Sequence, residues 1–236
     1  MSFPNPHPVP GSVMAGNIVG DHIYFDDFHT AGIDNGGSFS RSADGGHWLV
    51  TDDVDATVTV VDDEPGGVVR ITTNSSNNDF ASCQLNGESF KVTANKDIYC
   101  EMRFKFDDTD DTRWFFGLAA TDTTGTTIGP ILDGVSESIG FRQNTDTGVD
   151  VFALLENGNA ETTVDTGVNV ADDVFQVFAF HVLGSERVKF YIDGKEVANF
   201  TTNIPNGDAI TPTMEIHSPT ASSFVEVDYF LCMQVR

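Results

Sequence analysis

The sequence predicts an all-β fold, an antiparallel sandwich of two sheets, for three reasons. Short segments that alternate apolar and polar residues follow one another, with Gly, Asn, Asp and Thr between them. No window of about 12 residues carries the apolar stripe of an amphipathic helix. The 19 phenylalanines among 236 residues supply bulky side chains for a wide interior between two sheets.

Twelve segments have the composition and spacing of strands. In residues 97–106 the apolar side chains of Ile98, Cys100 and Met102 alternate with polar ones, which is typical of a strand buried on one face. Residues 174–183 are apolar on both faces, as expected of a central strand. The other predicted strands are residues 56–62, 67–73, 79–85, 113–122, 138–143, 149–155, 187–193, 197–202, 211–218 and 223–235.

Residues 187–202 are predicted to form a β-hairpin. Val188, Phe190 and Ile192 alternate with polar side chains, and Asp193-Gly194 is a dipeptide typical of tight two-residue turns. This hairpin is the clearest local signal in the chain.

Residues 1–20 are predicted to form an extended arm, and residues 21–236 a single sandwich domain. Prolines at alternate positions hold the backbone extended and cannot join a helix. We expect the arm to contact a neighbouring subunit or another protein; the alternative is a frayed terminus. The contact residues would be Phe3, Pro4, Pro6, Pro8 and Pro10.

The chain is strongly acidic, with 36 Asp and Glu against 12 Lys and Arg and a formal net charge of −24. Such a surface repels nucleic acid and anionic membranes, so neither is expected as a direct partner. Self-repulsion of this size is screened at high salt, which suggests a saline habitat; the alternative is an acidic protein kept soluble by its carboxylates.

Two further features bear on location. The N-terminus lacks the positive start and apolar segment of a signal peptide, and no run of about 20 apolar residues exists to span a membrane. Cys83, Cys100 and Cys232 show neither a metal-binding spacing nor a disulfide framework. The expectation is a protein made and kept in the cytoplasm unless it leaves within a larger particle.

The C-terminal third resembles the concanavalin A-like, laminin-G-like jelly rolls. The segments that carry the resemblance are "RVKFYIDGKEVANFTTNIP", "TPTMEIHS" and "VEVDYFLCMQVR". A second resemblance, to structural proteins of tailed viruses, rests on "FDDF", "GGVVRITT", "WFFGLAATD", "SIGFR", "DTGVNVADDVF" and the same hairpin. The first implies the fold, which hosts enzymes, lectins and structural domains alike. The second implies a virion surface protein.

Catalytic carboxylates are not expected. Glycoside hydrolases of this fold carry a Glu-x-Asp-x-x-Glu strand, because retention needs two carboxyl groups about 5 to 5.5 Å apart. Glu226 and Asp228 share a strand face but have no third acid after them, and Asp133 and Glu137 bracket a turn. We interpret all four as solvent-facing.

A lyase is also not expected. Alginate lyases of this fold use a Gln-Ile-His strand, and this chain has Glu215-Ile216-His217. A catalytic histidine would need a proton-transfer partner and an arginine to neutralise the substrate carboxylate, and this chain has few cations. We interpret His217 as a histidine at the rim of the sheet or partly buried.

No cofactor is expected, with calcium as the one ligand that the sequence suggests. Calcium takes six to eight oxygen ligands, and several loops are rich in aspartate. The favoured loop is "FDDTDDTRW", with Asp107, Asp108, Asp110 and Asp111. The alternative, a solvated turn, is common for such loops.

Four aromatic side chains are candidates for stacking on sugars, with core or interface packing as the alternative. They are Trp48, Trp114, Tyr191 and Tyr229. No carbohydrate-binding residue is assigned from the sequence.

The sequence as a whole predicts a non-enzymatic virion protein that decorates or cements a capsid surface. Its partner would be a major capsid protein, its location the virion after assembly in the host cytoplasm, and its state a homo-oligomer, with a trimer as the specific expectation. The alternative is a carbohydrate-binding, lectin-like module of a virion fibre or receptor-binding protein.

Overall fold

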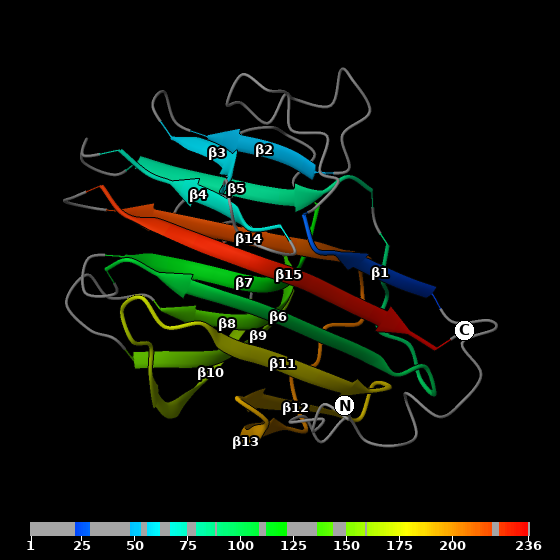
Figure 1. Cartoon of the computed structure of the whole chain (residues 1–236). Coiled ribbons are helices and arrows are strands. Elements are labelled where there is room, and N and C mark those ends of the chain that lie inside the picture. Colours follow the sequence, from blue (N-terminus) through cyan, green and yellow to red (C-terminus); the bar gives the residue numbers. More distant parts are fainter. Residues whose placement is uncertain are drawn as a thin grey trace, which may run out of the picture.

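The computed structural model describes residues 22–28, 48–52, 56–61, 67–74, 79–87, 89–108, 112–121, 136–143, 150–158, 160–218 and 222–235. All regular structure in these residues is β-strand, and the strands form two antiparallel sheets packed face to face (Figure 1). None of the described residues belongs to a helix of the length and hydropathy needed to cross a bilayer.

Sheet A has eight strands. Its order is β13 (Lys195–Phe200), β12 (Arg187–Ile192), β11 (Gln176–Leu183), β6 (Ile98–Phe106), β15 (Phe224–Gln234), β4 (Val69–Thr72) and β3 (Thr57–Val60). The eighth strand, β1 (His22–Asp26), pairs with the second half of β15, beyond the part that pairs with β4.

Sheet B has seven strands. Its order is β10 (Ala160–Asn169), β9 (Asp150–Asn157), β8 (Glu137–Gln143), β7 (Arg113–Ala120), β14 (Ile210–Ser218), β5 (Asp79–Leu85) and β2 (Trp48–Asp52). The late strand β14 lies between β7 and β5, as the late strand β15 lies between β6 and β4.

The predicted strands are all present, and the all-β sandwich is confirmed. In β6, the side chains of Ile98, Cys100 and Met102 are buried between the sheets as alternation predicts. Asp193 and Gly194 both have positive φ, 48° and 77°, which confirms the tight turn between β12 and β13. Three strands, β1, β2 and β10, were not predicted.

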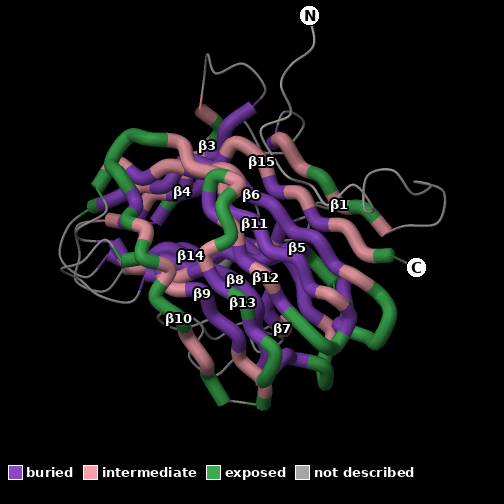
Figure 2. The backbone as a smooth tube through the Cα atoms, turned by 90° about the horizontal axis from the view of Figure 1, so that it is seen from below, coloured by how far each residue is buried: buried purple, intermediate pink, exposed green. Residues whose placement is uncertain are grey.

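The core between the sheets is built from aromatic rings (Figure 2, buried positions). Phe104 of β6 stacks on Phe116 of β7 with ring centroids 4.2 Å apart, and on Phe178 of β11 at 4.5 Å. Phe141 of β8 meets Phe178 edge to face at 5.1 Å. Phe104 therefore joins the two sheets, since β6 and β11 belong to one and β7 to the other.

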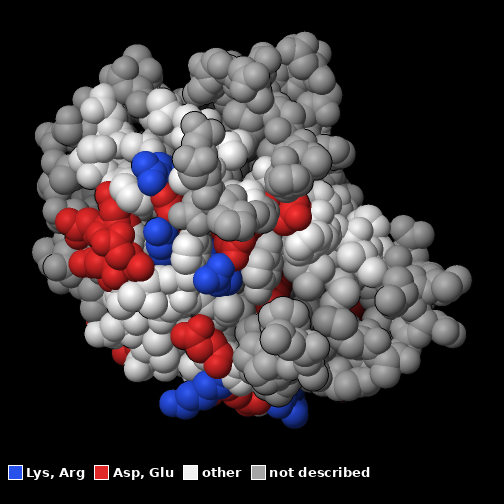
Figure 3. Space-filling model, viewed as in Figure 1, with Lys and Arg blue, Asp and Glu red and all other residues white. Residues whose placement is uncertain are grey.

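The outer face of sheet A carries charged side chains that bind one another. Glu226 of β15 lies between Arg70 and Lys105, and Arg103 pairs with Asp228. The phenol of Tyr229 donates a hydrogen bond to Glu101 at 2.7 Å. Figure 3 shows basic and acidic side chains side by side on this side of the molecule. The carboxylates of Glu226, Asp228 and Glu101 are thus paired with neighbours on the same face.

One of these pairs gives a pH dependence that can be measured. Burial raises the pKa of Glu226, but the hydrogen bonds from Lys105 and Arg70 outweigh it, so the net pKa is lowered. A carboxyl whose folded-state pKa is depressed stabilises the fold above its unfolded pKa, about 4.3, and loses that effect as pH falls through the folded value. Its contribution should therefore be present at neutral pH and absent in strong acid.

We expect Glu226→Gln to lower the free energy of unfolding at about pH 7 by roughly 1–3 kcal/mol, because the amide removes the negative charge and one of the two oxygens that accept from Arg70 and Lys105. Urea denaturation of wild type and variant at about pH 7 and about pH 3 checks this. The difference between the two proteins should shrink in acid. A difference of the same size at both pH values would contradict the assigned role of the carboxylate.

Candidate functional site on the outer face of sheet B

The outer face of sheet B carries polar side chains at its centre. Strand alternation sends Met214 and Ile216 of β14 into the core, so Thr213, Glu215 and His217 point to the opposite side. Glu215 is 0% exposed and His217 is 2% exposed. Buried ionisable groups on a sheet face are uncommon unless they have a structural or functional partner.

The register of the sheet brings side chains from five strands into one row across this face. Arg142 of β8 lies between Phe152 of β9 and Phe115 of β7, and Phe115 lies opposite Glu215 of β14. Ser82 of β5 lies on the far side of Glu215. The row therefore alternates aromatic rings with groups that form hydrogen bonds.

A second row lies beside the first. Arg113 at the start of β7 is the cross-strand partner of His217, and Phe80 of β5 lies on the other side of this histidine. Directly opposite residues of an antiparallel pair have Cβ atoms about 4.5–5.5 Å apart. An imidazole, a guanidinium and the Glu215 carboxyl two residues away on the same strand face therefore gather at this point.

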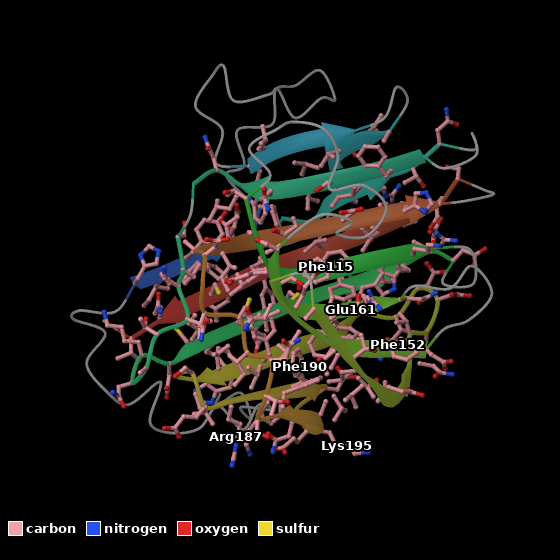
Figure 4. All side chains as sticks on the ribbon, turned by 180° about the vertical axis from the view of Figure 1, so that it is seen from behind. Phe115, Phe152, Glu161, Arg187, Phe190 and Lys195 are labelled. Carbon is pink, nitrogen blue, oxygen red and sulfur yellow. The ribbon has the colours of Figure 1, made fainter. Side chains whose placement is uncertain are left out.

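The part of the face over β7 to β9 also holds an apolar cluster beside Arg142. Phe115, Ala119 and Leu154 form a buried cluster there, separate from the main core. The ring of Phe115 lies over Gly140 of β8, where an added Cβ would come 2.7 Å from its Cε2 atom. The glycine therefore allows the ring to lie close against the sheet, and Figure 4 shows Phe115, Phe152 and Glu161 on this side of the molecule.

Arg142 binds Glu161 of β10 through both terminal nitrogens of its guanidinium. Its Nε atom is buried and has no hydrogen-bond acceptor among the described residues. The same holds for the hydroxyl of Ser138, four residues earlier on β8, in this part of the chain. A buried donor without a partner costs about 1–3 kcal/mol, so these two groups are unusual features of this part of the sheet.

Comparison with known proteins supports the fold. No protein-family model and no curated protein sequence matches the chain. Solved structures do match. The endo-1,3-β-glucanase of Streptomyces sioyaensis gives a TM-score of 0.61 at 12% identity, over 93% of this chain and 98% of that one. The chain has a concanavalin A-like jelly-roll fold.

Two other similar jelly rolls have different activities. An endo-β-1,4-glucuronan lyase from the fungus Trichoderma reesei gives a TM-score of 0.58 at 11% identity, over 89% of this chain and 94% of that one. The carbohydrate recognition domain of Emp46p gives 0.53 at 15% identity, over 79% and 88%. Proteins similar to this jelly roll thus cleave or bind carbohydrates.

The prediction that the chain is not an enzyme is wrong, because solved structures with the same fold include enzymes. Glycosidases and a lyase share this jelly roll over about nine tenths of its length. The prediction rested on the missing carboxylate string and on the small number of cations, but a sheet face collects catalytic groups from several strands. Enzymatic activity is therefore compatible with the structure. The capsid role, its capsid partner, the trimer and the virion location stay predictions, since none of these comparisons supports them.

The predicted calcium ligands are described only in part. One oxygen of Asp107 accepts hydrogen bonds from the Phe224 amide at 2.7 Å and the Ser223 hydroxyl at 3.0 Å, so it ties the end of β6 to the start of β15. Asp110 and Asp111 lie outside the described residues. No group of three acidic, histidine or cysteine side chains that could hold a metal occurs in the described part. The calcium site stays a prediction.

Other predicted positions are now placed. The arm, residues 1–20 with Phe3, Pro4, Pro6, Pro8 and Pro10, lies outside the described residues, as does Asp133. The carboxylate of Glu137 accepts hydrogen bonds from the Gly207 and Asp208 amides at 2.7 and 2.9 Å. Glu137 and Glu226 are buried, so the interpretation of both as solvent-facing is wrong.

The four aromatic candidates do not form a platform. Trp48 and Trp114 are core residues, 3% and 0% exposed, whose indole nitrogens donate to Asp26 and Gln143. Tyr191 and Tyr229 lie on sheet A. The aromatic side chains of the candidate site are Phe115 and Phe152, which sequence reasoning did not single out.

Proposed function

We propose that the outer face of sheet B binds a carbohydrate polymer. The observation that carries the proposal is the row across sheet B, in which the partly exposed ring of Phe152 lies beside the guanidinium of Arg142, with Phe115 and Glu215 beyond it. Sugar rings have apolar faces and a rim of hydroxyls, so a ligand of this class fits such a row.

The contrast with sheet A supports this choice of face. On sheet A, the carboxylates of Glu226 and Asp228 bind neighbouring cations, and Glu101 accepts from Tyr229. These three carboxylates are therefore already paired within sheet A. The similar glucanase, lyase and carbohydrate recognition domain add support at the level of the fold.

The test is a glycan binding screen followed by calorimetry on wild type and Arg142→Gln. We expect the variant to lose affinity by about 10- to 100-fold, the effect of one or two hydrogen bonds from a charged donor. The matched control is Lys189→Gln, because Lys189 also pairs with a glutamate, Glu196, but on sheet A. Failure of every glycan to bind, or equal losses in both variants, would overturn the proposal.

Cleavage of a uronate-containing polymer is a second candidate, favoured by the position of Arg113. Elimination needs a base to remove the proton next to the sugar carboxylate and a cation to neutralise that carboxylate. His217 would be the base and Arg113, directly opposite it, the cation. Glu215 lies two residues before His217 on the same strand face. Here His217 would take the proton from the carbon next to the carboxylate, the bond to the leaving oxygen would break, that oxygen would take a proton from water, and the product would gain a carbon–carbon double bond.

The net charge of the chain does not exclude this substrate class. The −24 refers to the whole chain, whereas Arg113 and Arg142 both lie on this one face. Local cations decide the potential at a binding site, because distant charges are screened beyond about 8–10 Å at physiological salt. Arg113, directly opposite His217, is therefore the cation that would meet a bound uronate, since Arg142 is already paired with Glu161.

A further inference from the structure

Cys100 and Cys232 are direct cross-strand neighbours in sheet A. Cys100 lies on β6 and Cys232 on β15, and the register pairs them with each other. Both are 0% exposed and point into the core, where the chain holds them as thiols. Burial and the neighbouring thiol of Cys232 raise the pKa of Cys100.

The third cysteine has no such neighbour. Cys83 lies on β5 of sheet B, where its cross-strand partners are Met214 and Val50. It therefore serves as an internal control for any reaction of the other two.

We propose that Cys100 and Cys232 are a disulfide-forming pair, and that a small-molecule disulfide such as oxidised glutathione links them while Cys83 stays a thiol. Opposed residues of an antiparallel pair have Cβ atoms about 4.5–5.5 Å apart, and a disulfide needs about 3.5–4.5 Å. A movement of about 1 Å between β6 and β15 therefore suffices.

The reaction is a two-step exchange. One thiolate attacks the small disulfide and releases its first thiol, and the second cysteine then attacks the mixed disulfide and releases the other. The two cysteines lose two electrons and two protons, which end on the two released thiols. Because both sulfurs are buried, the exchange takes place as the chain folds, before the core closes around them.

The bond would have a defined structural effect. The register of β15 against β6 shifts between Val227 and Tyr229, where β15 carries an irregularity. Cys232 follows that irregularity, so a bond to Cys100 would fix the register of the second half of β15. The same half pairs with β1, which the bond would hold in place as well.

The experiment is refolding of the reduced, unfolded full chain with oxidised glutathione, followed by alkylation of free thiols and peptide mapping by mass spectrometry. We expect the Cys100 and Cys232 peptides to be linked and Cys83 to be alkylated. The oxidised protein should melt about 10 °C above the reduced protein, because the bond closes a long loop. Alkylation of all three cysteines, or a bond that includes Cys83, would overturn the proposal.

Two variants test whether the rise in melting temperature comes from the Cys100–Cys232 bond or from another effect of oxidation. In Cys83→Ser the linked peptides and the rise in melting temperature should remain. In Cys232→Ala both should disappear, and a rise that persists would count against the assignment. If Cys232→Ala does not fold, the peptide map of the wild type decides alone.

Discussion

Replacement of His217 by asparagine should slow cleavage of a uronate polymer by about 10²–10⁴-fold, the usual contribution of a general base. Asparagine keeps a polar side chain of similar size at a position that is 2% exposed, so the variant avoids a large cavity. The rate is followed by the ultraviolet absorbance of the new double bond. Affinity for the polymer should change much less than kcat, because Arg142 and the aromatic rings remain.

The matched control is His22→Asn, since His22 lies on β1 of sheet A, away from this face. It should leave the rate of cleavage unchanged. Wild-type activity in His217→Asn would rule out the assigned base. Absence of cleavage by the wild type on every uronate polymer would rule out the second candidate and leave carbohydrate binding to be judged by the Arg142→Gln test.

The largest loss of stability is expected for Phe104→Ala. Phe104 is 1% exposed and stacks on Phe116 and Phe178, so its removal leaves a cavity where the two sheets meet. Phe→Ala substitutions in cores lower the free energy of unfolding by about 3–5 kcal/mol. Urea denaturation gives this difference directly, and the melting temperature should fall by about 10 °C.

Phe25→Ala is the control for the same chemical change on the surface. Phe25 of β1 is 57% exposed, and its ring centroid lies 6.3 Å from that of Tyr229. We expect its removal to change the free energy of unfolding by less than about 1 kcal/mol. Equal losses in the two variants would show that the stack around Phe104 does not hold the sheets together.

The fold was largely predictable because the alternation of apolar and polar residues along a strand shows which of its two faces is buried. The alternation in β6 and the Asp193-Gly194 turn identified their elements correctly. The strand β10 was missed because "AETTVDTGVN" has little apolar content and lies at the edge of sheet B, exposed over much of its length. An edge strand is held by backbone hydrogen bonds to its neighbour, and these do not require an apolar pattern in its own sequence.

The candidate site was less predictable because it depends on register between distant strands. His217 and Arg113 are more than 100 residues apart, and only the pairing of β14 with β7 brings them together. Arg142 and Phe115 meet through the pairing of β7 with β8 in the same way. Alternation alone places Ser138, Gly140 and Arg142 on one face of β8, but it does not say which strands lie beside them.

The two late strands also determine when the protein can fold during synthesis. β14 joins β7 to β5, and β15 joins β6 to β4 and β1, so sheet B is in two pieces and sheet A in three until residues 210–234 have left the ribosome. At about 5–20 residues per second, the preceding two hundred residues wait for more than a second with open strand edges. A nascent chain of this kind depends on chaperones or on its own negative charge to stay apart from its neighbours.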